Sequence, residues 1–192
     1  MREVALIVVW LMLSSSGVSA NDEWPMFRGI NAGVAADHPD LPDHWSETEN
    51  VVWKVDIPGL GWSSPIIWGD HVFVTTAISA GEEPQPVKGL YDPGNAHGKT
   101  DAIAGHRWMV YDIDLQTGEI RWERELRAAS PTIKRHLKAS FASETPVTDG
   151  ERLYVYFGSI GLVAALDMTG AVLWTHDLGA FNGHQEFAPA AS

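Results

Sequence analysis

The sequence predicts an all-β protein made of small antiparallel sheets, and two observations carry this prediction. First, its apolar stretches are short, rich in Val, Ile, Tyr and Phe, and interrupted by Gly, Asp and Pro, which is typical of strands joined by tight turns. Second, these stretches recur along the chain with their turn residues in corresponding places. Beyond residue 20, no segment has the 3.6-residue apolar periodicity of an amphipathic helix.

The clearest repeat combines a Thr-Gly turn with a tryptophan. Residues 113–122 read IDLQTGEIRW, and residues 166–174 read LDMTGAVLW, with a turn one residue shorter. The corresponding residues are Asp114, Thr117, Gly118 and Trp122 in the first copy and Asp167, Thr169, Gly170 and Trp174 in the second. Glycine supplies the positive φ of a tight turn at no steric cost. We therefore expect two hairpins, with arms 107–115 and 119–126 and arms 161–168 and 171–178.

A second repeated element precedes each hairpin. Residues 63–74 (SSPIIWGDHVFV) align without gaps on residues 144–155 (ETPVTDGERLYV), so that a Pro and a Gly coincide. A weaker copy of the Trp element, TENVVW at 48–53, stands before the first full unit. Each full unit thus predicts four strands: a Pro-led strand, a second strand after the Gly turn, and the two arms of the hairpin.

The recurring Trp indicates how such units pack. A four-stranded sheet is too small to bury both faces alone, whereas one large aromatic per sheet can cover about 150–250 Å² against the next sheet. That area corresponds to about 4–6 kcal/mol per Trp as an upper estimate. We therefore predict a partial β-propeller of four-stranded antiparallel blades, about two blades plus flanks of an incomplete ring. The expected units are about 45–122 and 123–174, and the start of a further blade at 175–192.

Two stretches between the units are longer than a blade requires. Residues 78–106 and 127–143 are rich in turn-forming and polar residues and predict inserted loops, which are often functional. The chain stops after Ala191-Ser192, at the point where the repeat has Ser-Ser before Pro. We expect a fragment of a longer protein; the alternative is that several short chains assemble one ring.

The N-terminus has the layout of a secretory signal peptide. Arg2 precedes an apolar run at 4–13, and small residues lead to Ala20, where cleavage is expected. The apolar run is far shorter than the ~20 residues of a membrane-spanning helix. The chain has no Cys, so its fold does not depend on disulfides, and its net charge of −12 argues against nucleic acid as a partner. We expect a periplasmic or secreted protein with no transmembrane segment.

The Asp-x-x-Thr-Gly-x-x-x-Trp element resembles the tryptophan-docking repeat of PQQ-like (quinoprotein alcohol dehydrogenase-like) β-propellers. The leading Ala of that pattern is replaced by Asp112 in the first copy, whereas Ala164 can fill it in the second. The segment WPMFRG at 24–29, with 41–77 and 133–158, is similar to a secreted bacterial subfamily. The resemblance covers nearly the whole chain after residue 20, but the fold hosts both enzymes and scaffolds.

The resemblance leaves two functions open. Quinoprotein dehydrogenases of the family hold PQQ between a Trp and adjacent Cys residues, with calcium and an Asp base. This chain has no Cys, and no set of residues matches the calcium ligands or the base. We predict a non-catalytic binding or scaffold module of the cell envelope, without a cofactor, that binds a protein, a peptide or a glycan, the remaining blades, or itself. The alternative is a PQQ-dependent dehydrogenase whose catalytic blades are missing from this chain.

Few individual residues point to a ligand. Lys134, Arg135 and His136 form a basic cluster in an acidic protein and are a candidate anion patch, although a solvated loop is the simpler interpretation. Arg28 is expected to fix the N-terminal segment through a charge-assisted hydrogen bond. A further group matches no standard metal spacing and is interpreted as a Gly-rich insertion: Asp92, Asn95, His97, Asp101 and His106.

Overall fold

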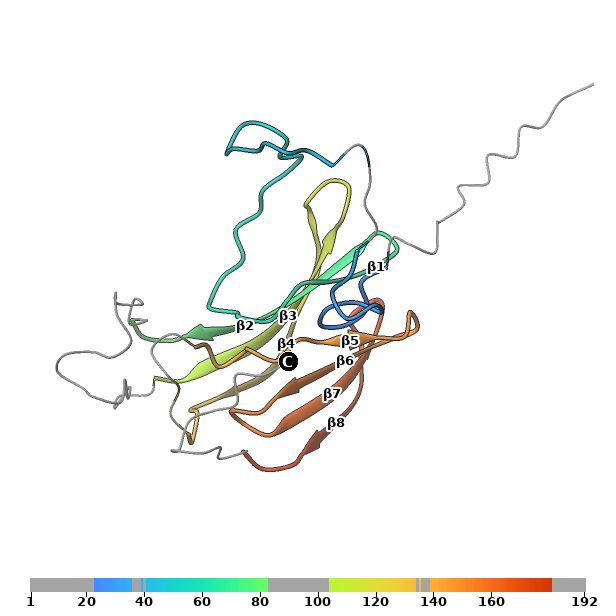
Figure 1. Ribbon diagram of the computed structural model, residues 1–192. Helices are drawn as coiled ribbons and strands as arrows, with labels where there is room; N and C mark the ends of the chain where they lie inside the picture. Colours follow the sequence, from blue (N-terminus) through green and yellow to red (C-terminus); the bar gives the residue numbers. More distant parts are fainter. Residues whose placement is uncertain are drawn as a thin grey trace, which may run out of the picture.

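The computed structural model consists of two four-stranded antiparallel sheets that lie side by side (Figure 1). The structure describes residues 23–35, 39, 41–82, 104–133, 135 and 139–180. In these ranges there is no helix, and hence none that is long and apolar enough to cross a membrane. The all-β prediction is confirmed, and each sheet has the four strands expected of one blade.

The first blade contains strands in the order β1-β2-β3-β4. Its strands are β1 (Ile66–Trp68), β2 (His71–Ser79), β3 (His106–Asp114) and β4 (Ile120–Ala129). The two long central strands pair from His71 with Asp114 to Ser79 with His106 without a register shift. The β3–β4 pair contains two irregularities, one of them beside Asp112.

The second blade repeats this arrangement in the order β5-β6-β7-β8. Its strands are β5 (Val147–Thr148), β6 (Arg152–Phe157), β7 (Leu162–Asp167) and β8 (Val172–Asp177). The β4 and β8 strands each continue beyond their Trp. Residues 123–129 and 175–177 therefore complete their own blades and do not open the next ones, whereas residues 181–192 lie outside the described residues.

The core lies between the two blades. One face of the first sheet supplies Ile66, Phe73, Trp108 and Val110, all completely buried. The facing side of the second sheet supplies apolar residues of β6 and β7, and the 139–145 connection adds two more residues. Those partners are Leu153, Val155, Phe157, Leu162, Ala164, Leu166, Phe141 and Ala142. Because each sheet is only four strands wide, most of its stability depends on this shared interior.

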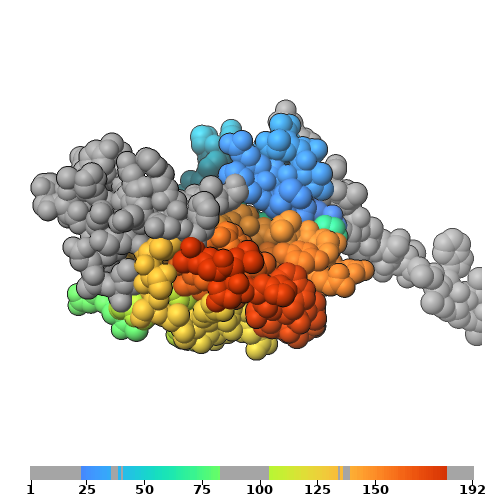
Figure 2. Space-filling model, turned by 90° about the horizontal axis from the view of Figure 1, so that it is seen from below, coloured from blue at the N-terminus to red at the C-terminus, as the bar shows by residue number. Residues whose placement is uncertain are grey.

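Two flanking segments pack on the blades without joining a sheet. Trp24 forms an isolated antiparallel bridge with Ile67 of β1, and the Pro25 carbonyl accepts a hydrogen bond from Thr148 N of β5. The N-terminal segment therefore connects the first strands of both blades, and Figure 2 shows it (blue) projecting above the second blade. Residues 51–57 belong to neither sheet, and from Trp53 to Ile57 half-buried residues alternate with exposed ones.

Candidate functional site

Each Thr-Gly turn is organised by its Asp. In the first blade the Asp114 carboxylate accepts hydrogen bonds from Gln116 N and Thr117 N, at 2.9 and 2.8 Å. In the second blade Asp167 accepts from Thr169 N, Thr169 Oγ1 and Ala171 N. Asp favours such turns because its side chain caps nearby backbone N–H groups. The turn ends in a buried glycine with φ of 74° in one blade and 81° in the other.

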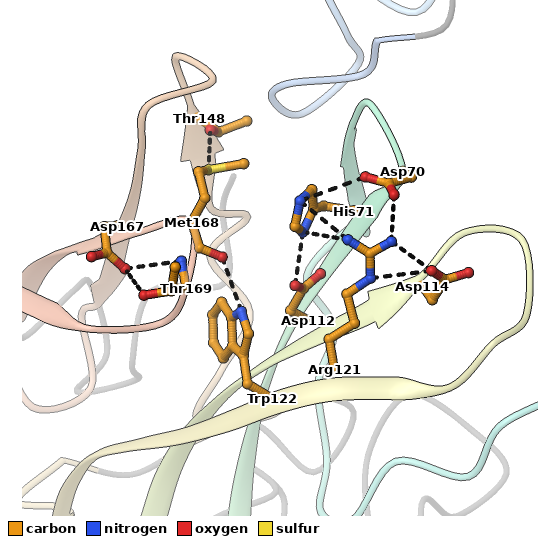
Figure 3. A network of polar contacts seen from close by, with 10 residues as sticks. All are labelled: Asp70, His71, Asp112, Asp114, Arg121, Trp122, Thr148, Asp167, Met168 and Thr169. Atoms are coloured by element: carbon orange, nitrogen blue, oxygen red, sulfur yellow. Dashed lines mark hydrogen bonds and ion pairs between the residues drawn. The ribbon is translucent and has the colours of Figure 1, made fainter. Parts of the chain in front are cut away.

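The indole of Trp122 docks on the turn of the following blade (Figure 3). Its Nε1 donates to the Met168 carbonyl at 3.0 Å, and its ring lies against Gly170. A Cβ at position 170 would lie only 2.7 Å from the ring, so the glycine is required by close approach as well as by its φ. Arg124 adds a bond from its Nε to the Gly170 carbonyl at 2.7 Å. Trp122 therefore joins consecutive blades, as the repeat predicted.

The same joint occurs one step earlier in the chain. The Trp53 Nε1 donates to the Leu115 carbonyl at 2.8 Å, and the Trp53 ring covers Gly118. The weak third copy of the repeat is therefore a docked indole like that of Trp122. A further indole, which the sequence analysis did not single out, lies against the next blade: the Trp68 ring contacts Gly150. The alignment of residues 63–74 with residues 144–155 places the turns at Gly69 and Gly150 in corresponding positions, but it does not show that one turn contacts the other.

The indole of Trp174 has the corresponding place in the second blade. It pairs with Ala165 across β7 and β8, as Trp122 pairs with Asp112 across β3 and β4. Its side chain is 39% exposed, and its neighbours on β8 are exposed as well. The structural counterpart of Asp112 is therefore Ala165, one residue after the Ala164 that the repeat pattern suggested.

A cluster of charged side chains lies at the turn end of the first blade (Figure 3). The Arg121 guanidinium donates through Nη2 to Asp70 and Asp114, both at 2.5 Å. His71 Nδ1 lies 2.8 Å from Asp112 Oδ2, and Arg121 Nη1 approaches His71 Nε2 at 3.3 Å. With its proton on Nδ1, the imidazole donates to Asp112 and presents Nε2 as an acceptor to Arg121.

These contacts shift the acidities of the cluster. The hydrogen bond from Arg121, and after it the backbone N–H groups of the turn, hold the pKa of Asp114 at about 2. The hydrogen bond from Arg121 also lowers the pKa of Asp70. Burial raises the pKa of Asp112 despite its bond to His71, because a completely buried carboxylate loses its hydration. The Oδ1 atom of Asp112 is buried without a hydrogen-bond partner.

The cluster is specific to the first blade. The second blade has Arg152 and Ala165 where the first has His71 and Asp112. The cluster therefore does not belong to the repeat. His71 stacks on Phe73 with ring centroids 5.6 Å apart, and Phe73 in turn contacts Trp122 at 5.9 Å. The charged cluster therefore lies beside the docked indole, and each of its charged groups contacts at least one other member of the cluster.

A second polar region lies where the two blades begin. Trp62 N donates to the Ala142 carbonyl, and Ser64 N donates to Thr145 Oγ1. Beside this seam the carboxyl group of Glu144 is buried and accepts from Gly158 N at 2.9 Å. Burial raises the pKa of Glu144 to about 6, with the backbone donors acting in the opposite direction.

The candidate anion patch is only partly within the described residues. Lys134 and His136 lie outside them. Arg135 is 2% exposed, donates to the Ala139 carbonyl at 2.8 Å, and stacks its guanidinium over the Phe141 ring. Arg135 thus has interior contacts, which differs from the solvated loop that the composition suggested.

The hydrogen bond predicted for Arg28 is not among the contacts within the described residues, and its role stays a prediction. Arg28 is exposed, has a φ of 63°, and lies over the ring of Phe27. The backbone groups of Trp24 and Pro25 hold the N-terminal segment.

The residues considered for a metal loop do not gather within the described part of the chain. His106 packs against Phe141 with its Nδ1 2.7 Å from the Ala104 carbonyl, whereas Asp92, Asn95, His97 and Asp101 lie outside that part. In the ranges that the structure covers, no group of three His, Asp or Glu side chains is placed to hold a metal ion.

Two consecutive four-stranded blades, joined by indoles that dock on the next Thr-Gly turn, define a β-propeller repeat protein. The family model PQQ_2, described as outer membrane protein assembly factor BamB, matches residues 34–180. That match covers more than half of the 192 residues, and the chain therefore belongs to this PQQ-like repeat family. Comparison with curated proteins gave no significant match.

The docked indoles do not fit the role of a quinone-binding platform. Trp53 and Trp122 each lie on a glycine of the next turn and use Nε1 on a backbone carbonyl. A ring that is occupied in this way cannot also stack on PQQ on that side. Trp53 and Trp122 therefore act as packing groups on that ring face.

Proposed function

We propose that the chain is an exported, non-catalytic binding or scaffold module of the cell envelope, and that its partner is a protein. The family model that it matches is described as an assembly factor of the outer membrane, which supports a scaffold role. The use of two repeat indoles in blade packing supports it as well, because Trp53 and Trp122 both have one ring face and Nε1 engaged by the next turn. Export follows from the signal peptide predicted at residues 1–20.

The observation that carries the proposal is an anchored loop with exposed apolar side chains. Backbone bonds to β1 and β5 fix the base of the N-terminal segment. Beyond that base, four apolar side chains are between 41 and 70% exposed: Met26, Phe27, Ile30 and Val34. Exposed apolar side chains grouped on one anchored loop are typical of interaction sites, and Met and aromatic residues are enriched in protein interfaces. Apolar side chains favour a protein over a glycan.

Crosslinking in cells tests this proposal. A photoreactive amino acid at Ile30 should give a discrete crosslinked product in the envelope fraction. The product should be lost in a variant that also carries Phe27→Ser, and it should persist with Val52→Ser, a matched change at an apolar residue that is 88% exposed elsewhere. A crosslinking pattern that is the same in all three proteins would contradict the proposal.

The dehydrogenase alternative has its own test. Purified protein is supplied with PQQ and calcium, and dye reduction is followed with alcohols and sugars as substrates. We expect no turnover above that of PQQ and calcium alone. Sustained turnover that depends on the protein would replace the scaffold function by the alternative.

A further inference from the structure

Three strands of the first blade are longer than their counterparts in the second. β2 and β3 have nine residues each and β4 has ten, whereas β6, β7 and β8 have six each. The turn ends of the two blades correspond, because His71 pairs with Asp114 as Arg152 pairs with Asp167. The additional residues therefore lie at the opposite ends of β2, β3 and β4, on the left in Figure 1.

The extended strand ends form a cavity of about 570 Å³. It is lined by residues 78–80, 105–107 and 128–130, none of which has a counterpart in a strand of the second blade. The backbone ladder continues through this region, where His106 pairs with both Ser79 and Ala129. Cavities that bind small ligands have volumes of about 300–1,000 Å³. The cavity is thus large enough for a ligand and is an addition to the blade repeat.

The wall of the cavity is largely apolar. Ile78, Ala80, Ala128 and Ala129 contribute aliphatic side chains, and the buried ring of His106 lies among them in the lining. Because alanine side chains are small, they leave room that larger residues would fill. Burying polar groups without hydrogen-bond partners is costly. Such a wall therefore favours an apolar side chain over the hydroxyl-rich surface of a sugar.

Arg107 brings hydrogen-bond donors to the cavity. Its Nε donates to Glu125 Oε2 at 2.6 Å, which holds the guanidinium in place. Among the described residues, no hydrogen bond uses its two Nη groups. A guanidinium donates through Nη as well as through Nε, so these groups are available to a ligand.

The charges around Arg107 favour a neutral hydrogen-bond acceptor. The hydrogen bond and charge of Glu125, and more weakly the charge of Glu123, raise the pKa of Arg107. Two carboxylates therefore act on one guanidinium, in a chain whose net charge is −12. These charges oppose a ligand carboxylate, whereas the carbonyl oxygen of an amide accepts a hydrogen bond without adding charge.

We propose that this cavity binds a peptide segment of a partner protein. An apolar side chain of the peptide occupies the cavity, and a main-chain carbonyl next to it accepts a hydrogen bond from Nη of Arg107. The cavity lies at the other end of the first blade from the N-terminal loop, because Trp24 bridges Ile67 close to the β1–β2 turn. It is therefore a second contact surface, and the inference does not depend on the function proposed for that loop.

NMR titration of the purified full chain with small probes tests the proposal. N-acetylphenylalanine N-methylamide has an apolar side chain between two neutral amides. N-acetylphenylalanine has a carboxylate instead of one amide, N-acetylglycine N-methylamide lacks the side chain, and N-acetylglucosamine represents a glycan. We expect the first probe to shift the amide signals of Ser79, His106 and Ala129 saturably, with a Kd on the order of 1 mM. The other three probes should bind at least about 5-fold more weakly.

Three variants locate the binding. Ala128→Phe fills the cavity and should abolish the saturable shifts, whereas Ala35→Phe adds the same ring at an exposed position outside it and should leave them unchanged. Arg107→Met removes the Nη donors and should weaken binding about 5-fold, which corresponds to one hydrogen bond. Circular dichroism checks that each variant keeps the β-sheet signal.

Three results would overturn the proposal. One is the absence of saturable shifts with the neutral phenylalanine amide. Another is unchanged binding by Ala128→Phe or by Arg107→Met. The third is tighter binding of N-acetylphenylalanine or N-acetylglucosamine than of the amide, because the cavity would then recognise a carboxylate or a sugar and not an uncharged peptide group. None of these results changes the crosslinking expected at Ile30.

Discussion

Replacing Gly170 by alanine tests the blade joint at its tightest contact. An alanine at φ 81° pays about 1–2 kcal/mol for the left-handed backbone alone. Its Cβ would also lie 2.7 Å from the Trp122 ring, whereas carbon atoms prefer about 3.5–4.0 Å. The indole must therefore move by about 1 Å, which breaks its 3.0 Å bond to Met168 at a cost of about 1 kcal/mol. The expected loss of unfolding free energy is about 2–3 kcal/mol.

A second glycine separates the two contributions. Gly69 also has a positive φ, 59°, but a Cβ there would meet nothing within 4 Å. Gly69→Ala should therefore lose only about 1–2 kcal/mol. Urea denaturation followed by circular dichroism gives both values. In a Trp122→Ala background, Gly170→Ala should fall to the Gly69→Ala cost, because no ring remains to be displaced. Equal losses for Gly170→Ala and Gly69→Ala in the wild-type background would refute the docking argument.

Two further predictions concern ionisation. The pKa of Glu144 is raised from 4.5 to about 6 by burial, so its stabilising contribution is complete below pH 4.5 and is lost as pH rises through 6. A pKa shift of that size corresponds to about 2 kcal/mol of unfolding free energy. The urea midpoint of the wild type should fall over this pH window, and that of Glu144→Gln should fall less. Parallel curves for the two proteins would contradict the assignment. Arg121→Gln should raise the pKa of Asp114 from about 2 toward 3.8, but not fully, because the N–H groups of Gln116 and Thr117 remain. Carboxyl-carbon NMR titration measures this directly, and an unchanged pKa would mean that the turn alone lowers it. The contribution of Asp114 to stability is present above pH 3.8 and is lost as pH falls toward 2, so it should be smaller in the variant.

The fold was predictable because its determinants are local and repeated. A Thr-Gly turn followed by Trp defines a hairpin through backbone conformation alone, and two copies at Gly118 and Gly170 imply a stack. The structure adds which turn each indole meets, namely that of the next blade. No spacing between Trp122 and Met168 could have shown that contact, because it depends on the relative position of two sheets.

The polar groups were harder to predict because burial decides their behaviour. Arg135 stands in a basic stretch that suggests a solvated loop, yet contacts with Ala139 and Phe141 bury it. Asp112 was visible as a departure from the repeat pattern. Its pairing with His71, 41 positions earlier in the chain, follows from the β2–β3 register and not from any local signal.

The most direct test of indole docking is amide and indole hydrogen exchange by NMR. The Nε1 hydrogens of Trp53 and Trp122 donate to carbonyls of the next turn, whereas Trp174 has no such bond within the described residues. The Nε1 hydrogens of Trp53 and Trp122 should exchange slowly, and their rings should show contacts to the Hα atoms of Gly118 and Gly170. The Trp174 hydrogen should exchange fast. Equal, rapid exchange at Trp53, Trp122 and Trp174, without those contacts, would contradict the account of how the blades are joined.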